Sequence, residues 1–239
     1  MNVRPQDLPS TFPIFPLPNV VLFPSAKLPL HIFEPRYRQM TADALEGNRV
    51  IGMVLMRQSA APAEPTNPSG GAEPGPPPPP PSVYEVGCAG RIGQYRQLPD
   101  GRYNFILEGV SRFRILEEIQ DEKLYRSVRA EVLPEPSFGE LDPPSREALD
   151  ALRTELEAHL MELAKRSAPD AERELKARIA ELNPIQLVHA VAFGLDCNVI
   201  EKQGLLDADG PVLRSELLSR LLEFRKAETQ HSTSSKWIN

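Results

Sequence analysis

Cysteine is scarce in this chain of 239 residues, which contains only Cys88 and Cys197. Two thiols so far apart give no disulfide framework, and without a CxxC pair they do not indicate a zinc site. Long apolar runs are missing as well. No stretch approaches the roughly 18 residues of a membrane span, and residues 1–10 lack the apolar core of a secretory signal. We therefore expect a cytoplasmic protein with no membrane partner.

Motifs for phosphate binding and for hydrolysis are also missing. The sequence has no GxxxxGK[ST] loop, no GxGxxG, no HExxH and no GxSxG elbow. Its four histidines, His31, His159, His189 and His231, fall on separate predicted elements, so no metal site is expected. Cys88 has no activating neighbour and is predicted to be an inert thiol. These absences predict a non-enzymatic protein without cofactor or metal.

The sequence also lacks the excess of positive charge that nucleic-acid binding requires. Residues 1–133 carry 14 Lys or Arg and 14 Asp or Glu, whereas residues 134–239 carry 13 and 19, so the net charge of −6 lies in the second part. Nucleic-acid binding depends mainly on clustered Lys and Arg that neutralise phosphates. We expect no nucleic-acid partner, although four nearby arginines leave a local basic patch open: Arg112, Arg114, Arg126 and Arg129.

Short apolar stretches with frequent breakers dominate residues 1–133. Five prolines punctuate residues 12–33, which favours short or edge strands, and Glu34-Pro35 opens a predicted helix that ends near Glu46. The run 50–56 is continuously apolar, as in a strand buried on both faces. Alternating residues then indicate further strands over 91–98, 103–108, 112–115 and 127–132, joined by tight turns. The pattern predicts an antiparallel barrel or sandwich.

A proline-rich segment, residues 57–82, interrupts this β-rich part. It holds ten of the chain's 26 prolines, six of them in succession from Pro76 to Pro81. Such a composition cannot bury a core, so we expect a disordered loop inserted within the domain. The interpretation favoured for residues 59–82 is a tolerated insertion, since a longer loop adds little closure free energy. The alternative is a docking site for a proline-recognising partner.

The period changes to that of helices after a breaker-rich hinge at residues 134–144. Leucines recur every three or four residues between Leu149 and Leu163, and His189 falls beside an apolar helical face, where a hydrogen-bonded core histidine is expected. Asn183-Pro184 and Asn198 are typical helix starts. A last helix is predicted to begin at residues 209–211 and to bury Leu213, Leu217, Leu221 and Phe224, with a frayed tail after Glu228.

The opening stretch LPSTFPIFPLPNVVLFPSAKLPLHIFEPRY resembles the start of the N-terminal substrate-binding domain of Lon proteases. The likeness continues through YEVGCAGRI, LPDGRYNFILEG and SRFRI, and persists in EKQGLL and LRSELLSRLLEF of the second part. Each motif alone is weak, whereas their combination and order are specific. The resemblance covers most of residues 10–226 outside the proline-rich insertion.

The resemblance implies an α+β fold in which a PUA-like antiparallel pseudo-barrel with one short helix (residues 1–133) precedes a helical bundle (residues 134–239). It also implies a domain that engages unfolded or tagged polypeptide and contributes to assembly, so a homodimer is left open. The ATPase and Ser-Lys protease modules of Lon are not in this sequence. We therefore expect a stand-alone, non-catalytic polypeptide-binding or adaptor module. Two alternatives are a small-molecule sensor with a pocket at the barrel–helix junction and a hydrolase centred on His31 and Glu34.

Four motif residues are candidates for contacting an extended polypeptide: Glu34, Arg36, Tyr37 and Arg112. Each also has a structural interpretation. Glu34 suits the positive end of a helix dipole, Arg36 could pair with Glu34, and Tyr37 could pack under the helix. Arg112 alternates with Phe113, so it is expected to face outward while Phe113 fills the core. Three glycines are expected where strands bend or bulge: Gly87, Gly90 and Gly109.

Overall fold

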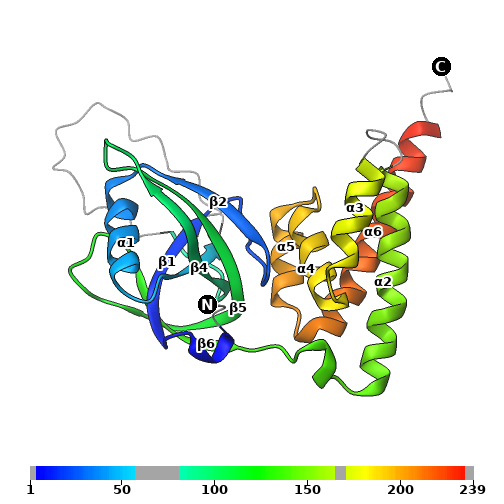
Figure 1. Cartoon of the computed structure of the whole chain (residues 1–239), viewed down its shortest axis with the longest axis horizontal. Helices are drawn as coiled ribbons and strands as arrows, with labels where there is room; N and C mark the ends of the chain where they lie inside the picture. Colours follow the sequence, from blue (N-terminus) through cyan, green and yellow to red (C-terminus); the bar gives the residue numbers. More distant parts are fainter. Residues whose placement is uncertain (1–3, 58–80, 165–170, 235–239) are drawn as a thin grey trace, which may run out of the picture.

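The computed structural model describes residues 4–57, 81–164 and 171–234. Within them, the six strands and helix α1 precede residue 134, and helices α2 to α6 follow residue 142. Figure 1 shows the strands and the later helices as two neighbouring halves. Most of the proline-rich segment lies outside the described residues, as do residues 235–239. The fold is α+β, as the sequence predicts.

The strands form one mixed sheet in the order β2-β5-β4-β3-β1-β6, and β5 also pairs with β6. These pairings close β1, β3, β4, β5 and β6 into a ring, which we call the strand ring, while β2 adds to it through β5. The bounds are Thr11–Leu17 (β1), Lys27–Ile32 (β2), Val50–Leu55 (β3), Val86–Gln97 (β4), Tyr103–Ile119 (β5) and Ser127–Leu133 (β6).

The expectation of a purely antiparallel sheet is wrong, because β1 and β3 run parallel. A parallel pair needs a long crossover, and here β2 and helix α1 lie between the two strands in sequence. The first prolines predict short or edge strands, and β2, which contains Pro29, stands at the edge of the sheet. Strand β1 contains Pro13 and Pro16, yet it pairs with both β3 and β6. Residues 11–13 pair with β6, and residues 14–17 pair with β3. Each part of β1 therefore has one side without a partner strand, and a proline, which lacks an N–H, is tolerated where its nitrogen faces that side.

Helix α1, Pro35–Glu46, has the predicted bounds. Glu34 precedes it in an extended conformation, and proline occupies its first turn, where the missing N–H has no helical partner. Its buried residues are Tyr37, Met40, Thr41 and Ala44, at helical spacing. Helix α1 therefore packs one face against the strand ring, on the side away from the later helices (Figure 1).

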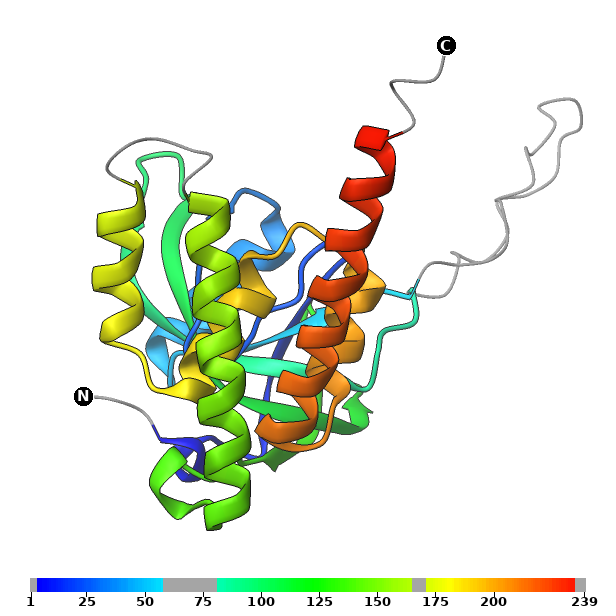
Figure 2. The same ribbon diagram turned by 90° about the vertical axis from the view of Figure 1, so that its right-hand side faces the viewer.

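The helical half consists of α2 (Pro143–Ala164), α3 (Ala171–Ala180), α4 (Pro184–Gly194), α5 (Val199–Asp207) and α6 (Gly210–Ser234). Asn183 caps α4 and Asn198 caps α5, as predicted, each within a capping box. Helix α6 continues past Glu228 to Ser234, and the frayed tail predicted after Glu228 stays a prediction. The long helices α2 and α6 lie side by side (Figure 2), while α4 and α5 lie between them and the sheet (Figure 1).

The buried face of α6 differs from the one predicted. Leu213 and Phe224 are exposed, and the residues that the helix buries include Arg214, Ser215, Leu218 and Leu222. The predicted stripe is displaced by one position because an arginine and two serines occupy part of the buried face, where an apolar pattern cannot reveal them. The polar residues of this face become important for the contact between the two halves.

One apolar cluster runs through both halves. It includes Phe23 and Leu107 from the strand half and Leu205 and Leu218 from the helical half. A second cluster, with Phe12, Phe113 and Val128 among its members, fills the strand ring. Strand β3 is buried along its whole length, as its uninterrupted apolar run predicts. The two halves thus share buried surface.

Close backbone contacts explain the predicted glycines. A Cβ on Gly87 would lie 2.5 Å from the carbonyl oxygen of Met53, and one on Gly109 would lie 2.1 Å from that of Phe23. Gly90 stands at a register shift between β4 and β5. The insertion between β3 and β4 also joins neighbouring strands, and its ends are held together where Arg57 N–H donates to the Ser82 carbonyl at 2.8 Å.

Candidate functional site

Three of the four predicted site residues, Glu34, Arg36 and Tyr37, line one groove of about 330 Å³. We call it the α1 groove, because these residues stand at the start of helix α1. The opposite wall comes from the segment before β6, with Leu124 and Tyr125. The remaining lining residues are Pro16, Leu17, Pro18, Met56, Pro81 and Arg126. Segments far apart in the sequence therefore converge here.

Tyr37 forms an aromatic floor under the groove. Its ring lies 4.4 Å from that of Phe15, and the guanidinium of Arg36 lies 4.5 Å above the ring centroid. Arg36 also pairs with Glu34, with an N–O distance of 2.9 Å. Burial raises the pKa of Tyr37, so its hydroxyl stays protonated at neutral pH. Both structural interpretations, the Glu34–Arg36 pair and the packing of Tyr37, are confirmed.

The opposite wall presents an exposed apolar side chain beside neutralised charges. Leu124 is 66% exposed, a large fraction for leucine. Next to it, the hydroxyl of Tyr125 donates to Asp43 at 2.6 Å. Arg126 forms an ion pair with Glu118 and donates to the carbonyl of Pro81 at 2.9 Å. Every arginine at this groove thus has an acidic partner, and the surface is apolar and charge-balanced.

The fourth predicted residue, Arg112, does not face solvent, and the expectation that it points outward is wrong. Arg112 is only 3% exposed. Its Nε donates to Glu135 at 2.7 Å, and its Nη1 donates to the carbonyl of Leu206 at 3.2 Å. The alternation with Phe113 correctly places the two side chains on opposite faces of β5. The helical half covers the outer face at this point, which a strand pattern cannot indicate.

Arg112 belongs to a buried ionic cluster that joins the two halves. We call Arg112, Glu135, His189 and Arg214 the junction cluster. Glu135 lies 2.6 Å from the Nη2 of Arg214 and 3.3 Å from the Nε2 of His189. Arg214 is fully buried and donates to the carbonyls of Leu205 and Ala208. It thereby satisfies carbonyls at the end of α5 that lack helical partners.

The electrostatics of the junction cluster favour a carboxylate between two arginines. Burial alone would raise the pKa of Glu135, but the hydrogen bonds and the charge of Arg214 outweigh burial, so the pKa of Glu135 lies well below its ordinary value. Burial lowers the pKa of His189. A neutral ring accepts a hydrogen bond at Nε2 from Arg214 at 2.7 Å, because a guanidinium can only donate. The predicted core histidine is confirmed.

Two members of the junction cluster, Glu135 and Arg214, are not among the residues predicted from the sequence. Glu135 follows β6 in the breaker-rich segment, where its neighbours suggest only a hinge. Arg214 precedes Leu217, Leu218 and Leu221 by three, four and seven residues, which is the spacing of one helix face. This spacing is the signal in the sequence that Arg214 lies on the same helix face as these leucines.

A small cavity of about 170 Å³ lies at the junction of the two halves. Val110, Ser111 and Glu135 line it from the strand side, and Ile185 and His189 line it from helix α4. The Nδ1 of His189 has no hydrogen-bond partner among the described residues. The small-molecule sensor alternative predicts a pocket between the strands and the later helices, where this cavity lies.

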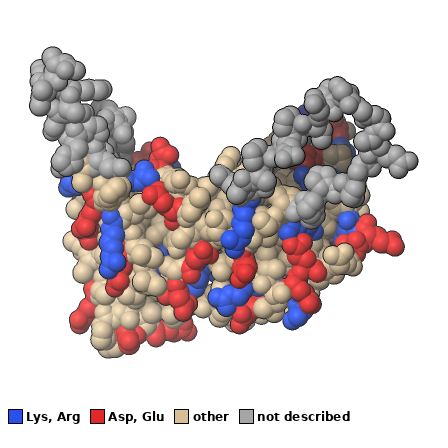
Figure 3. All heavy atoms as spheres, turned by 180° about the vertical axis from the view of Figure 1, so that it is seen from behind, with Lys and Arg blue, Asp and Glu red and all other residues tan. Residues whose placement is uncertain are grey.

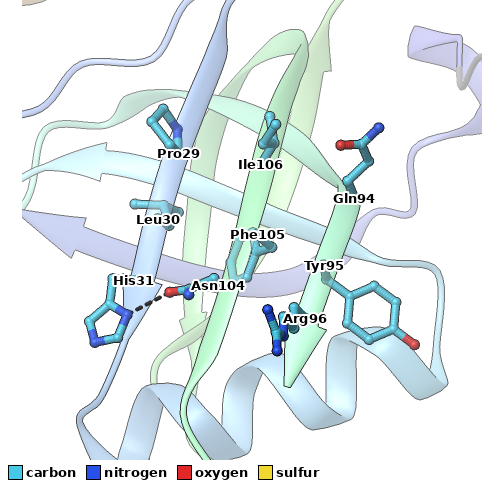
Figure 4. Close-up of a pocket in the computed structure, with 9 residues that line it drawn as sticks. All are labelled: Pro29, Leu30, His31, Gln94, Tyr95, Arg96, Asn104, Phe105 and Ile106. Carbon is cyan, nitrogen blue, oxygen red and sulfur yellow. Dashed lines mark hydrogen bonds between the residues drawn. The ribbon is translucent and has the colours of Figure 1, made fainter. Parts of the chain in front are cut away.

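A larger and shallower hollow of about 530 Å³ lies on strands β2, β5 and β4 (Figure 4). We call it the sheet hollow. Its lining includes Leu30, His31, Asn104, Phe105 and Arg96. The Nδ1 of His31 lies 2.6 Å from the Oδ1 of Asn104, and its Nε2 lies 3.4 Å from Arg102. The described residues show no hydrogen bond between His31 and Glu34, so the structure does not assemble the acid–base pair of the hydrolase alternative.

Cys88 is a further candidate for a reactive group, and it is buried. Burial raises the pKa of the Cys88 thiol far above its ordinary value, as expected for a core cysteine. Over residues 4–57, 81–164 and 171–234, no three His, Cys, Asp or Glu side chains gather as metal ligands. In the same ranges, no helix has the length and apolarity needed to cross a membrane.

The chain is similar in sequence to known proteins. Lon protease of Anaeromyxobacter dehalogenans is 30% identical over 226 residues, which are 95% of this chain and 24% of that protein. Lon protease 2 of Myxococcus xanthus is 29% identical over 95% of this chain. The chain thus spans about a quarter of the length of these curated relatives.

Solved structures agree on the fold. The Lon N-terminal domain protein from Xanthomonas campestris aligns with a TM-score of 0.58 and 20% identity, over 88% of this chain and 97% of that one. The N-terminal domain of the Mycobacterium avium complex Lon protease gives 0.64 and 13%, over 89% and 98%. The family model described as the ATP-dependent protease La (LON) substrate-binding domain matches residues 11–223. The chain belongs to this family of LON substrate-binding domains.

Proposed function

We propose that this chain is a non-catalytic module that binds unfolded or extended polypeptide at the α1 groove. The observation that carries the proposal is the convergence of Glu34, Arg36 and Tyr37 with the exposed Leu124 in one charge-balanced groove. The family assignment supports a polypeptide-binding function. Arg112 is left out of the binding surface, since its guanidinium already bonds Glu135 and Leu206.

The chemistry of the α1 groove suits a partner of variable sequence. Its charged groups are paired with one another, so a ligand does not have to supply a fixed charge pattern. An apolar side chain of the ligand can pack against Leu124 and the aromatic floor, with a gain of about 25 cal/mol for each Å² of apolar area removed from water. Unfolded chains expose such side chains, whereas folded proteins bury most of them. A preference for unfolded protein follows.

The distribution of surface charge bears on the class of partner. On the face shown in Figure 3, acidic and basic side chains are interleaved without a large basic area. This supports protein as the partner, in a reducing cytoplasm, without a nucleic acid or a membrane surface. We further infer that the strand ring is the PUA-like pseudo-barrel and that α2 to α6 form its helical bundle. The proposal includes an adaptor that works as a monomer or as a homodimer.

Binding of an unfolded model protein tests the proposal. The full chain is titrated with fluorescently labelled, reduced and carboxymethylated α-lactalbumin, and with the same protein in its native folded form. We expect binding of the unfolded form only. Leu124→Asp is expected to weaken it about tenfold, which corresponds to about 1.4 kcal/mol and to less than the full burial of one leucine.

Leu116→Asp is the matched control, because Leu116 is 49% exposed and lies outside the α1 groove. It is expected to bind as the unchanged protein does. Equal binding of the unfolded and folded forms would contradict the proposed function. Equal losses in the two leucine variants would remove the α1 groove as the site.

A small-molecule sensor is the second candidate function, and the cavity at the junction is the observation that favours it. Its volume of about 170 Å³ is below the roughly 300–1,000 Å³ of ordinary ligand pockets, so we rank it second. A screen of metabolites by thermal shift tests it. A reproducible rise in Tm with one metabolite, abolished by Ser111→Trp, would support the sensor, whereas no rise with any compound would remove it.

A further inference from the structure

The sheet hollow has an ordered arrangement of side chains. In the registers of β2, β5 and β4, His31 pairs with Asn104 and Asn104 with Arg96, so these three form one row across three strands. Two residues along the strands, Pro29 pairs with Ile106. Side chains two positions apart point to the same face of a sheet. Figure 4 shows these two rows, with Gln94 at the β4 end of the second row and the row of Leu30, Phe105 and Tyr95 between them.

The polar row carries unused hydrogen-bond donors. Several other surface arginines are paired with acids, such as Arg102 with Asp100 at 2.6 Å and Arg129 with Glu117 at 2.7 Å. Arg96 is exposed, and no acidic partner is found for it among the described residues. Asn104 uses its Oδ1 toward His31, which leaves its amide N–H₂ group to donate outward. Neighbouring positions in a sheet are about 5 Å apart, so one carboxylate can reach both donors.

The second row supplies an apolar contact. Pro29 is exposed and Ile106 is half-buried in this row. Leu30, Phe105 and Tyr95 form the register row in between, whose side chains alternate to the other face of the sheet. The surface therefore offers a place for an apolar side chain beside a place for a carboxylate.

The spacing of the two rows defines a pattern in the occupant. Residues two apart on a strand are separated by about 6.7 Å, and an extended peptide has the same repeat. We propose that the sheet hollow binds an extended polypeptide segment in which an apolar residue and an acidic residue are two positions apart. The apolar residue contacts Pro29 and Ile106, and the carboxylate accepts hydrogen bonds from Arg96 and Asn104. This site is separate from the α1 groove. It gives the protein a preference for a sequence pattern, which the α1 groove does not provide.

Short labelled peptides and the full chain test this assignment by fluorescence anisotropy. The host is a nine-residue Gly/Ser peptide that carries Leu-Ser-Asp, compared with peptides that carry Leu-Ser-Asn, Leu-Ser-Lys or Leu-Asp-Ser. We expect the Leu-Ser-Asp peptide to bind about tenfold more tightly than the other three, since a charged pair strengthens the hydrogen bonds. Equal affinities, or no measurable binding of the Leu-Ser-Asp peptide, would overturn the proposal.

Charge reversal identifies the residue responsible. Arg96→Glu is expected to invert the preference, so that the Leu-Ser-Lys peptide binds more tightly than Leu-Ser-Asp. Arg220→Glu is the matched control, because Arg220 is also exposed and has no ion pair among the described residues but lies on α6. It should leave the preference unchanged, and a preference that persists in Arg96→Glu would overturn the assignment.

Failure of this assignment is distinguishable from failure of the proposed function. Leu124→Asp weakens binding of unfolded α-lactalbumin if the α1 groove is used, and it should leave the peptide preference intact. A preference for Leu-Ser-Asp that disappears in Leu124→Asp but persists in Arg96→Glu would move the carboxylate site to the α1 groove. The unfolded-protein assay can fail while the peptide preference holds, and the reverse is also true.

Discussion

Replacement of Glu135 by Gln is expected to destabilise the fold strongly, because it removes the buried counter-charge of two buried cations and leaves only the exposed Asp209, 3.7 Å from Arg112. Glu135 accepts from Arg112 at 2.7 Å and lies 2.6 Å from Arg214, and the side chains of these arginines are 4% and 0% exposed. Glutamine keeps the shape and one acceptor but loses the negative charge. The perturbation therefore isolates electrostatics from packing.

The expected loss is about 3–5 kcal/mol of unfolding free energy, the usual cost of breaking a buried ion pair by removing one partner. For a protein of this size, each kcal/mol changes the Tm by about 2–4 °C, so the Tm should fall by roughly 6–20 °C. Arg112→Met combined with Glu135→Gln removes one of the stranded cations, and we expect it to restore part of the loss.

Thermal unfolding followed by circular dichroism measures this effect at pH 7. Glu117→Gln is the control: its pair with Arg129 is also 2.7 Å long but is exposed to solvent, so the Tm should not change measurably. The folded-state pKa of Glu135 lies below the ordinary value of 4.5. Its contribution is therefore complete above about pH 4.5 and is lost as the pH falls below that value, so the variant and the unchanged protein should converge in acid. Equal Tm losses for Glu135→Gln and Glu117→Gln at pH 7 would refute the reasoning.

Three further predictions concern stability. Gly109→Ala places a Cβ 2.1 Å from the Phe23 carbonyl oxygen and should cost about 1–3 kcal/mol in urea unfolding, whereas Gly139→Ala, with no atom within 4 Å, should be neutral. Asn183→Ala removes the cap that accepts from Gln186 at 2.9 Å and should lower the Tm by about 2–4 °C, with no change contradicting the assignment. Burial lowers the pKa of His189 from 6.5, so the unfolded state binds more protons below that pH and stability should fall as the pH drops through 6.5; His189→Gln should flatten this dependence, and an unaltered slope would count against it.

Much of the fold could be predicted from local patterns. Helix α1, the buried strand β3 and the caps at Asn183 and Asn198 are confirmed, because each depends on residues close in sequence. Strand direction is different. The apolar pattern of β1 is the same whether its neighbour is parallel or antiparallel, so the parallel β1–β3 pair could not be predicted. The prolines of β1 do not reveal that this strand pairs on both sides, because pairing on alternate sides is a property of the whole ring.

The candidate site shows the same division. Glu34, Arg36 and Tyr37 lie together because they are neighbours in sequence, and the helix start fixes their geometry. Leu124 completes the α1 groove from a distant segment, and no sequence signal pointed to it. Arg112 was misplaced because its exposure depends on whether a helix covers the outer face of β5. Long-range packing decides such cases, and single-sequence patterns do not contain it.

The α1 groove and the sheet hollow share a short segment of chain. His31 lines the hollow and Glu34 lines the groove, and three residues span at most about 11 Å. Phe33 stands between them with 61% of its surface exposed. A single extended polypeptide that occupies both surfaces would therefore gain from a high effective concentration at the second one. None of the four junction-cluster residues lines either surface, so their replacement should change stability while leaving the affinity of the folded protein for polypeptide unaltered.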